Sequence, residues 1–493
     1  MELEGAGGRA KTSYEIALER LRGRREQLTR SRQPDPPPKA PDPDGESDGS
    51  VFVKTDNVSV RDNNLDRRKP KHPDRSPPPF SFPDPVEEQK NLTEDMPSLP
   101  PPVPEEYEVI CHWGGPMFDY GGYARMNRSY IIQLHSRGAL IKVRPMESIT
   151  DVNTKTEEFL RELERVELPT RWPRVYGMTI PDLISHGGRK ILYTMMETSN
   201  HVHREYADRL NLADEIWVPC QWNVDTFKAS GVLPNIKKMP LGVDTKLFSP
   251  GSDPLPLRAK GFRFISVFGW SYRKGFDVLI QAFLEEFSAK DDVSLVMSSR
   301  FVGQVSKSGQ NRIASDFKHV RALVAKPDHE LPHILLHSAR TPDKDMPRLY
   351  AAAHCFVLIS RGEGFGLPYI EAACCGLPVI ASDHGGQRDF LDADNSYLVP
   401  PDGYFTSNRT DVAFRNMAWI SHFYEGQDFP AYERPAVDLC RAHMRRVYES
   451  YGEAKQKAEK LRAKIVSEFS WDQAVERVYG RLKEICSEVK VST

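Results

Sequence analysis

Short apolar segments of strand character alternate with segments of helical periodicity over most of this 493-residue chain, from about residue 107 onward. After Gly275, apolar side chains recur at the i, i+3, i+4 and i+7 spacing of a one-faced helix, at Phe276, Leu279, Ile280 and Phe283. We predict strands at 107–113, 139–144, 190–195, 215–219, 262–268, 292–297, 333–337, 355–360 and 378–381. This alternation is typical of parallel sheets covered by helices on both faces, and it predicts an α/β protein.

Residues 1–105 differ in composition from the rest of the chain. Nearly half of the 39 prolines lie there, among few aromatic or β-branched residues. Such a segment cannot offset its ordering entropy, so we expect a disordered tail with local polyproline II structure. Within it, Thr12–Thr29 carries a few apolar residues among many charges. Two interpretations stay open for this island: a solvated, partly formed helix, or a docking peptide for a protein partner.

The ordered part is predicted to divide into two sheet domains, 106–248 and 249–468, with a linker near Gly242–Pro250. Ligands of doubly wound sheets bind beyond the carboxyl ends of the strands, so two facing sheets would form a cleft between the domains. The last segment, 469–493, is predicted to be a helix because Ser470–Gln473 has a capping-box pattern.

The segment Arg361–Glu371 joins an apolar strand to a helix through a glycine-rich turn. Glycine lets a ligand approach the backbone closely. A helix that begins near Pro368 directs free N–H groups and the positive end of its dipole at an anion. Glu363 and Glu371 flank the turn, and a carboxylate accepts hydrogen bonds from vicinal hydroxyls. Donors for phosphate beside acceptors for sugar hydroxyls suit a nucleotide sugar.

The spacing of Glu363 and Glu371 around Gly-Phe-Gly-Leu-Pro resembles the signature of retaining glycosyltransferases of the GT-B class, family 4. The resemblance continues through Gly376–Ala381 and Asn395–Val399, and it extends weakly over residues 106–489. It implies two Rossmann-like domains that face each other across a cleft, with the nucleotide on the C-terminal domain. It also implies that the last helix crosses back onto the N-terminal domain.

The same resemblance assigns roles around the turn. Glu371 would accept hydrogen bonds from the ribose hydroxyls, and Glu363 would bind sugar hydroxyls near the reacting carbon. The residues expected to let the backbone approach the donor are Gly364, Phe365, Gly366 and Leu367.

Two adjacent cations, Arg273 and Lys274, lie in the loop Gly269–Gly275 between a predicted strand and the helix that follows it. Arg can hold phosphate oxygens bidentately and Lys acts as a point charge, so the loop suits a diphosphate. A solvated turn is the alternative. In the resembled family, an Arg and a Lys here neutralise the leaving diphosphate. Trp270 occupies the usual Arg position, so the role transfers more firmly to Lys274 than to Arg273.

Two further loops are candidates for donor binding. Gly121 and Gly122 do not form the G-x-G-x-x-G fingerprint of dinucleotide binding. They resemble the family's N-domain loop against the donor, and a plain turn is the alternative. Glu197 stands where many relatives carry a His that contacts the sugar. His201 and His203 lack the acidic or cysteine neighbours of a metal site, so we interpret them as surface residues.

Composition excludes several classes of function. The net charge of −2 gives no general attraction to nucleic acid. Seven cysteines without paired spacing argue against a disulfide framework and favour a reducing compartment. We see no apolar run long enough for a transmembrane helix and no signal-peptide pattern at the N-terminus. We expect a cytoplasmic protein without a metal or cofactor, and peripheral membrane association stays open.

The resulting hypothesis is a retaining hexosyltransferase that moves a sugar from a nucleotide diphosphate donor to an acceptor hydroxyl, with the acceptor unidentified. One alternative is a sugar-nucleotide epimerase or a phosphorylase on the same fold. Another is a non-catalytic scaffold whose tail recruits partners.

Overall fold

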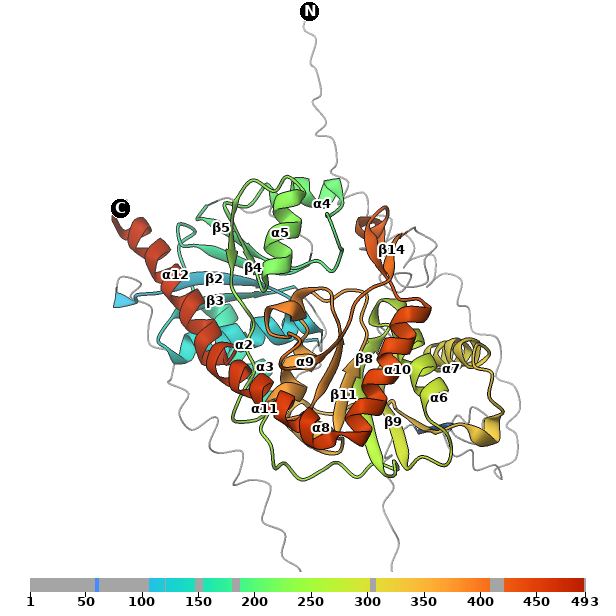
Figure 1. Cartoon of the computed structure of the whole chain (residues 1–493). Coiled ribbons are helices and arrows are strands. Elements are labelled where there is room, and N and C mark those ends of the chain that lie inside the picture. The colour runs from blue at the N-terminus through green and yellow to red at the C-terminus, as the bar shows by residue number, and fades with distance from the viewer. Residues whose placement is uncertain are drawn as a thin grey trace, which may run out of the picture. The chain divides into compact units, whose positions relative to one another are not determined.

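Two parallel β-sheets organise the part of the chain that the structure describes (Figure 1). The computed structural model describes residues 58–61, 106–119, 121–146, 154–179, 187–301, 307–407 and 421–491. The first sheet has six strands in the order β3-β2-β4-β5-β6-β7, and all neighbours are parallel. In chain order these strands are β2 (Ile110–Gly115), β3 (Leu140–Pro145), β4 (Arg174–Gly177), β5 (Lys190–Tyr193), β6 (Glu215–Val218) and β7 (Asn235–Lys238).

The second sheet has seven strands in the order β1-β10-β9-β8-β11-β12-β13, again all parallel. They are β1 (Val58–Arg61), β8 (Phe262–Trp270), β9 (Val293–Phe301), β10 (His333–His337), β11 (Cys355–Leu358), β12 (Val379–Ser382) and β13 (Tyr397–Val399). A separate antiparallel hairpin pairs β14 (Gly403–Thr406) with β15 (Asp428–Ala431).

The predicted α/β class with two parallel sheets is confirmed, and every predicted strand overlaps a strand of the structure. The missed strands are short or carry charges where an apolar run was sought; β7, for example, includes Lys237 and Lys238. β1 pairs with the edge strand β10, although its four residues fall in the segment predicted to be disordered. The remainder of residues 1–105, including Thr12–Thr29, lies outside the described residues. The domain boundaries stay predictions.

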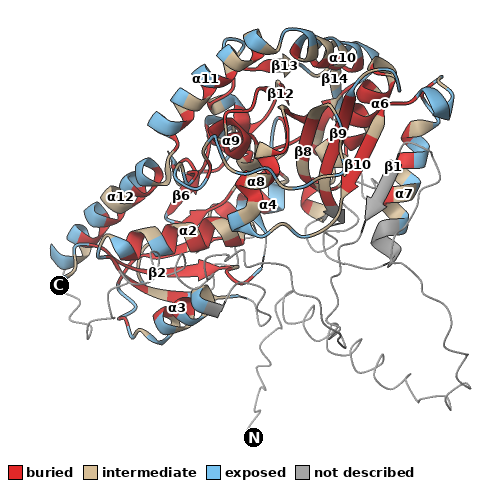
Figure 2. Ribbon diagram, turned by 90° about the horizontal axis from the view of Figure 1, so that it is seen from below, coloured by how far each residue is buried: buried red, intermediate tan, exposed pale blue. Residues whose placement is uncertain are grey.

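Helices cover the sheets, and their buried sides face inward (Figure 2). In α6 (Phe276–Glu286), the four apolar residues that predicted the helix are all buried. The other α-helices are α2 (Gly122–Ser136), α3 (Thr154–Arg165), α4 (Arg204–Leu210), α5 (Gln221–Ala229), α7 (Lys307–Arg321), α8 (Met346–Ala351), α9 (Leu367–Cys374), α10 (Arg434–Glu449), α11 (Tyr451–Glu468) and α12 (Trp471–Val491). None of the helices within the described residues is both long enough and apolar enough to cross a bilayer.

The chain passes between the two sheets at two places that lie side by side. The Val243 N–H donates to the Phe469 carbonyl at 2.9 Å, and the Trp471 N–H donates back to Val243 at 3.1 Å. Beyond this point α12 packs on the first sheet and on α2 (Figure 1). The Trp471 ring meets the Tyr130 ring edge-on at 5.2 Å, and the Cys486 thiol donates to the Ile110 carbonyl at 3.2 Å. The end of the chain is thus attached to the six-stranded sheet.

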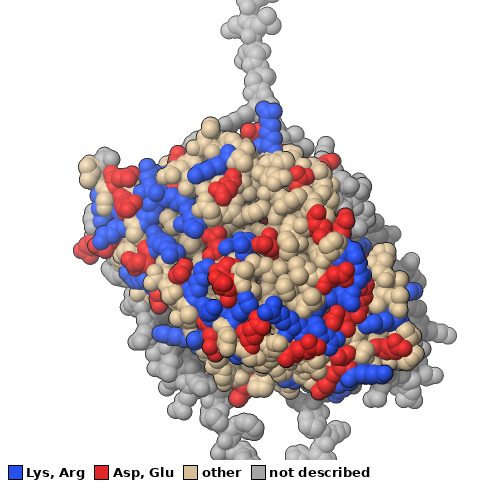
Figure 3. Space-filling model, in the orientation of Figure 1, with Lys and Arg blue, Asp and Glu red and all other residues tan. Residues whose placement is uncertain are grey.

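Ion pairs join α10 to α6 on the outer face, where Figure 3 shows blue and red side chains interspersed. Arg434 and Arg441 contact Glu285, at 2.7 and 3.4 Å, and Arg445 contacts Glu286 at 2.7 Å. Such partly exposed pairs contribute little each. The stability of this domain therefore comes mainly from the apolar contacts beneath them.

Candidate functional site

The glycine-rich turn lies between β11 and α9 of the seven-stranded sheet and packs against the loop that follows β5 of the other sheet. A Cβ on Gly364 would lie 2.6 Å from Met195 Cγ, so a larger residue there would force the Met195 side chain to move. Gly366 has φ +97°, a left-handed conformation that glycine adopts without strain, and it caps the N-terminus of α9. The turn therefore needs glycine for two reasons: close approach of the other sheet's loop, and the entry into α9.

The neighbouring residues of the turn point in different directions. Phe365 is buried and packs against Phe390 and Phe469, with ring centroids 5.5 and 6.1 Å away. Leu367 is the first residue of α9 and is half-buried. Phe365 thus offers its backbone to the site while its side chain belongs to the core.

Both predicted cations pair with carboxylates at this turn. Lys274 Nζ lies 2.6 Å from Glu363 Oε1, and Arg273 Nη2 lies 3.3 Å from Glu197 Oε1. Arg273 Nη1 also donates to the Gly362 carbonyl at 2.5 Å. Less than a fifth of each of the four charged side chains is exposed. The structure therefore brings Glu363, Lys274, Arg273 and Glu197 together, and the last comes from the other sheet.

Glu371 makes a third pair, which also joins the two sheets. Arg125 Nη2 in α2 lies 2.6 Å from Glu371 Oε1, and the Tyr350 hydroxyl donates to Glu371 Oε2 at 2.9 Å. Glu371 itself is buried. Each carboxylate oxygen therefore has one partner in the protein and keeps one acceptor position for another.

Burial and charge shift the pKa values of these groups in opposite directions. Burial lowers the pKa of Lys274, although Glu363 opposes this effect. Burial also acts to lower the pKa of Arg273, but Glu197 and Glu363 outweigh it and raise that pKa. The Glu371 carboxylate raises the pKa of Arg125 against the effect of burial. Neighbouring carboxylates thus favour the charged forms of Arg273 and Arg125. For Lys274, Glu363 favours the charged form but does not fully offset the effect of burial on the pKa.

Gly121 and Gly122 begin α2, the helix that carries Arg125. Gly121 precedes the helix, and its N–H donates to Asp119 Oδ1 at 2.5 Å. A Cβ on Gly122 would meet no atom within 4 Å, so packing does not require glycine there. The predicted loop thus leads into a helix whose first turn reaches Glu371.

Three further residues contact this site although no sequence pattern predicts a role for them: Arg361, Arg125 and Tyr350. Arg361 is buried and donates two hydrogen bonds to Asp277, both 2.7 Å long. It also lies over the Tyr272 ring, 3.8 Å from its centroid. Arg361 therefore fixes the turn against α6. Burial of an Arg beside a glycine-rich turn would have indicated a role for Arg361. A single sequence, however, does not show which of its arginines are buried.

The histidines near the site lie in three different surroundings. His384 is buried beside Trp222, its Nε2 lies 3.1 Å from Ser199 Oγ, and burial lowers its pKa to about 4. His203 accepts a hydrogen bond from the Glu205 N–H at the start of α4, and His201 is exposed. Within the described residues, no group of three or more His, Cys, Asp or Glu side chains is arranged to hold a metal ion.

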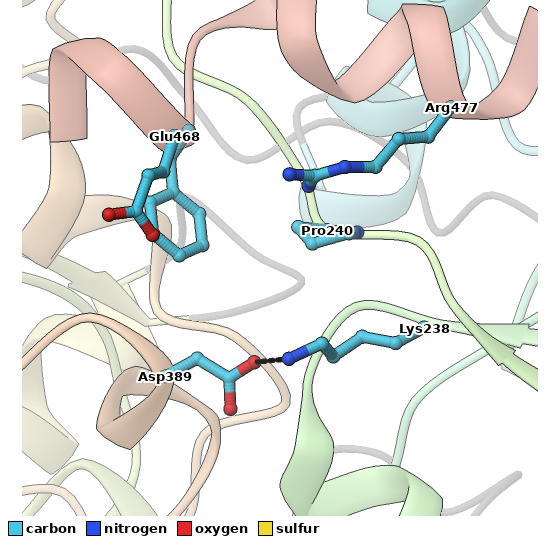
Figure 4. Close-up of a pocket in the computed structure, with 6 residues that line it drawn as sticks. Lys238, Pro240, Asp389, Glu468 and Arg477 are labelled. Atoms are coloured by element: carbon cyan, nitrogen blue, oxygen red, sulfur yellow. Dashed lines mark hydrogen bonds and ion pairs between the residues drawn. The ribbon is translucent and has the colours of Figure 1, made fainter. Parts of the chain in front are cut away.

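A separate pocket of about 330 Å³ lies where β7, the segment Gly386–Asp389 and the junction of α11 and α12 meet (Figure 4). Its lining residues are Lys238, Pro240, Asp389, Glu468, Phe469 and Arg477. Lys238 and Asp389 form an ion pair across it at 3.2 Å. The pocket is lined by none of the six paired residues described above: Lys274, Arg273, Glu363, Glu197, Arg125 and Glu371.

Comparison with known proteins gives the chain's relatives. Residues 259–407 match the sequence model of the family described as glycosyl transferases group 1. The chain is 26% identical, over 241 residues, to the GDP-mannose-dependent monoacylated alpha-(1-6)-phosphatidylinositol monomannoside mannosyltransferase of Corynebacterium glutamicum. That match covers 44% of this chain and 56% of the relative, so the chain spans about half the length of the curated relatives it matches.

Solved structures resemble the chain in fold. Sucrose-phosphate synthase from Thermosynechococcus elongatus superposes with a TM-score of 0.55 and 15% identity, over 77% of this chain and 100% of that one. Anabaena Alr3699/HepE, solved in complex with UDP and glucose, gives 0.52 and 13%, over 76% and 100%. At this identity the likeness concerns the fold alone, and that fold is GT-B.

Proposed function

We propose that this chain, whose residues 259–407 match the glycosyl transferases group 1 family, transfers a hexosyl group from a nucleotide diphosphate sugar to an acceptor hydroxyl with retention of configuration. One observation carries the proposal. A lysine and an arginine, each largely buried, meet two carboxylates beside a glycine turn at the carboxyl ends of parallel strands. That is the place where doubly wound sheets bind ligands.

In this proposal Lys274 and Arg273 bind the diphosphate and stabilise the charge that grows on it as it leaves, which is commonly the largest catalytic effect. The bond from the anomeric carbon to the diphosphate oxygen breaks. A bond from that carbon to the acceptor oxygen forms on the same face, and the acceptor proton passes to the leaving diphosphate. Since two protein cations supply the positive charge, we propose that no metal is required.

Glu371 and Glu363 serve as acceptors for the donor's hydroxyl groups. Glu371 has one acceptor position left on each oxygen beside Arg125 and Tyr350, so it can receive a ribose diol without losing either partner. Glu363 is held by Lys274 next to the turn, where sugar hydroxyls would lie.

All seven cysteines are free thiols, which supports a reducing, cytoplasmic location.

A panel of UDP-, GDP- and ADP-sugars tests the function. The true donor, at about 100 times its Kd, should stabilise the protein by about 2.7 kcal/mol, which raises the melting temperature by several degrees. The same donor should be hydrolysed slowly without acceptor, with release of the nucleotide diphosphate and a sugar whose anomeric configuration NMR identifies.

Three other results would contradict the proposal. Recovery of an epimerised nucleotide sugar would favour an epimerase, and phosphate-dependent release of a sugar phosphate would favour a phosphorylase. No thermal shift with any nucleotide sugar would favour a non-catalytic scaffold.

A further inference from the structure

Tyr424 forms the outer end of a chain of three side chains that reaches the leaving-group site. Its hydroxyl donates to Glu197 Oε2 at 2.6 Å, and Glu197 Oε1 lies 3.3 Å from Arg273 Nη2. Tyr424 is 3% exposed. The two oxygens of one carboxylate therefore join a buried tyrosine to the guanidinium of Arg273.

The segment that carries Tyr424, which we call the strap (residues 421–431), is attached to the loop that follows β5. The Ser199 N–H donates to the Asp428 carbonyl at 2.9 Å, and Asn200 donates to Asp428 Oδ2 at 3.1 Å. Phe423 meets the Tyr206 ring edge-on at 5.4 Å. These contacts fix the strap to the segment that begins with Glu197.

The strap is also attached to the loop that carries the cations. Phe429 in the strap packs against Phe405 of β14, and Phe405 packs against Tyr272, each pair with ring centroids 6.2 Å apart. Tyr272 precedes Arg273 directly. The strap lies beyond residues 259–407, so it is not part of the stretch that the family model matches.

We propose that Tyr424 is a positioning residue for the leaving group: it holds Glu197, and Glu197 holds Arg273 at the diphosphate. This inference rests on the proposed function. It assigns Glu197 to Arg273 as its counter-ion, in place of the direct contact with the donor sugar expected from the sequence. A carboxylate with both oxygens occupied cannot rotate freely, so the guanidinium keeps one direction even before the donor arrives.

The alternative is that Tyr424 only fastens the strap. The hydroxyl and the ring can be separated experimentally, because Tyr424→Phe keeps the ring against Phe429 and removes the hydroxyl that donates to Glu197. Tyr479→Phe is the matched control, since Tyr479 donates to Glu108 at 3.4 Å on an exposed face. A fastening role lowers the melting temperature without changing the chemistry.

The test measures kcat and donor KM with the donor that the panel identifies, and binding of inorganic pyrophosphate by calorimetry. Tyr424→Phe should lower kcat by about fivefold to tenfold, the scale of one typical hydrogen bond, and weaken pyrophosphate binding, while donor KM changes less. The control should stay within about twofold of the wild type. Glu197→Gln keeps the shape of the side chain and removes its charge. Adding Tyr424→Phe to this variant should lower kcat by less than a further factor of about two.

Several outcomes would overturn this role. An unchanged kcat in Tyr424→Phe would leave the tyrosine as a fastener, and so would losses that multiply in the double variant. Tighter pyrophosphate binding in either single variant would show that Glu197 competes with the donor for Arg273. A wild-type protein that neither binds pyrophosphate nor hydrolyses any donor contradicts the proposed function itself, whereas an active wild type with an equally active Tyr424→Phe contradicts only the positioning role.

Discussion

Arg125 and Glu371 lie 246 residues apart in the sequence and 2.6 Å apart in the structure, guanidinium Nη2 to carboxylate Oε1. The first belongs to α2 beside the six-stranded sheet and the second to α9 beside the seven-stranded sheet. The carboxylate that we propose for the ribose is therefore held by the opposite domain. The Arg125–Glu371 ion pair therefore connects the two sheets and also includes the carboxylate proposed to bind the donor.

Arg125→Met should weaken binding of the nucleotide by roughly 1–3 kcal/mol, because it leaves the buried Glu371 carboxylate without its cation. Arg137→Met is the control at the opposite end of α2, since Arg137 caps the C-terminus of that helix and pairs with Asp472, whose side chain is 80% exposed. The Arg137→Met substitution should weaken nucleotide binding by less than about 1 kcal/mol. Calorimetry with the identified nucleotide measures both. Tighter binding in Arg125→Met would show instead that the ion pair competes with the ribose.

Glu371→Gln should reduce donor affinity by roughly 1–3 kcal/mol, the scale of a charged hydrogen bond lost in a cleft. Glu215→Gln is a control of the same kind, because Glu215 is buried and pairs with Arg481 at 2.6 Å away from the turn. That control should lower the melting temperature and leave donor affinity alone. If the folded Glu371→Gln protein binds the donor as the wild type does, Glu371 is not part of the site.

Lys274→Ala and Arg273→Ala should each lower kcat by more than about tenfold, or 1.4 kcal/mol, since each cation lies where leaving-group charge would develop. Lys238→Ala is the comparison, because Lys238 also pairs with a carboxylate, Asp389, but in the pocket of Figure 4. It should turn over at nearly the wild-type rate. Normal turnover in both site variants would place the diphosphate elsewhere.

A chelator should leave wild-type turnover unchanged.

Stability should fall as the pH drops from about 6.5 toward 4. Burial lowers the pKa of His384 and of His112 to about 4 in the folded protein, against an ordinary value near 6.5. The unfolded chain therefore binds more protons in this interval, and stability is lost as the pH falls. Each histidine should cost roughly 1–2 kcal/mol at pH 5. Urea unfolding at pH 7.5 and pH 5 measures the loss, and His384→Gln should reduce it. An equal loss of stability in His384→Gln would show that His384 does not contribute to the pH dependence.

Deletion of residues 1–100 should leave donor hydrolysis intact. The deletion removes β1, a four-residue edge strand, so the melting temperature should change by only a few degrees. The alternative is a tail that folds over the cleft, anchored by Val51–Val53 or Phe80–Phe82, both outside the described residues. A truncated protein that folds but cannot bind the donor would favour that alternative.

Local patterns in the sequence predicted what depends on neighbours in the chain. The spacing of Phe276, Leu279 and Ile280 predicted a one-faced helix, and α6 buries all three. The run Cys355–Ile359 predicted a strand, and β11 begins at Cys355. The glycine-rich turn was legible because its order of strand, turn and helix is local. β7 was missed since its lysines give no apolar pattern, and only pairing with β6 defines it as a strand.

The sequence by itself determined the α/β class, the glycine turn and the candidate charges on either side of it. It could not determine which charge meets which. The partners Arg125 and Glu371 are 246 residues apart, and Tyr424 and Glu197 are 227 apart. Such contacts follow from how two sheets and their helices pack, and packing is set by the sum of many apolar contacts rather than by any local spacing. Only the tertiary structure therefore decided that two of the site's four ion pairs, Arg273 with Glu197 and Arg125 with Glu371, join elements of different sheets.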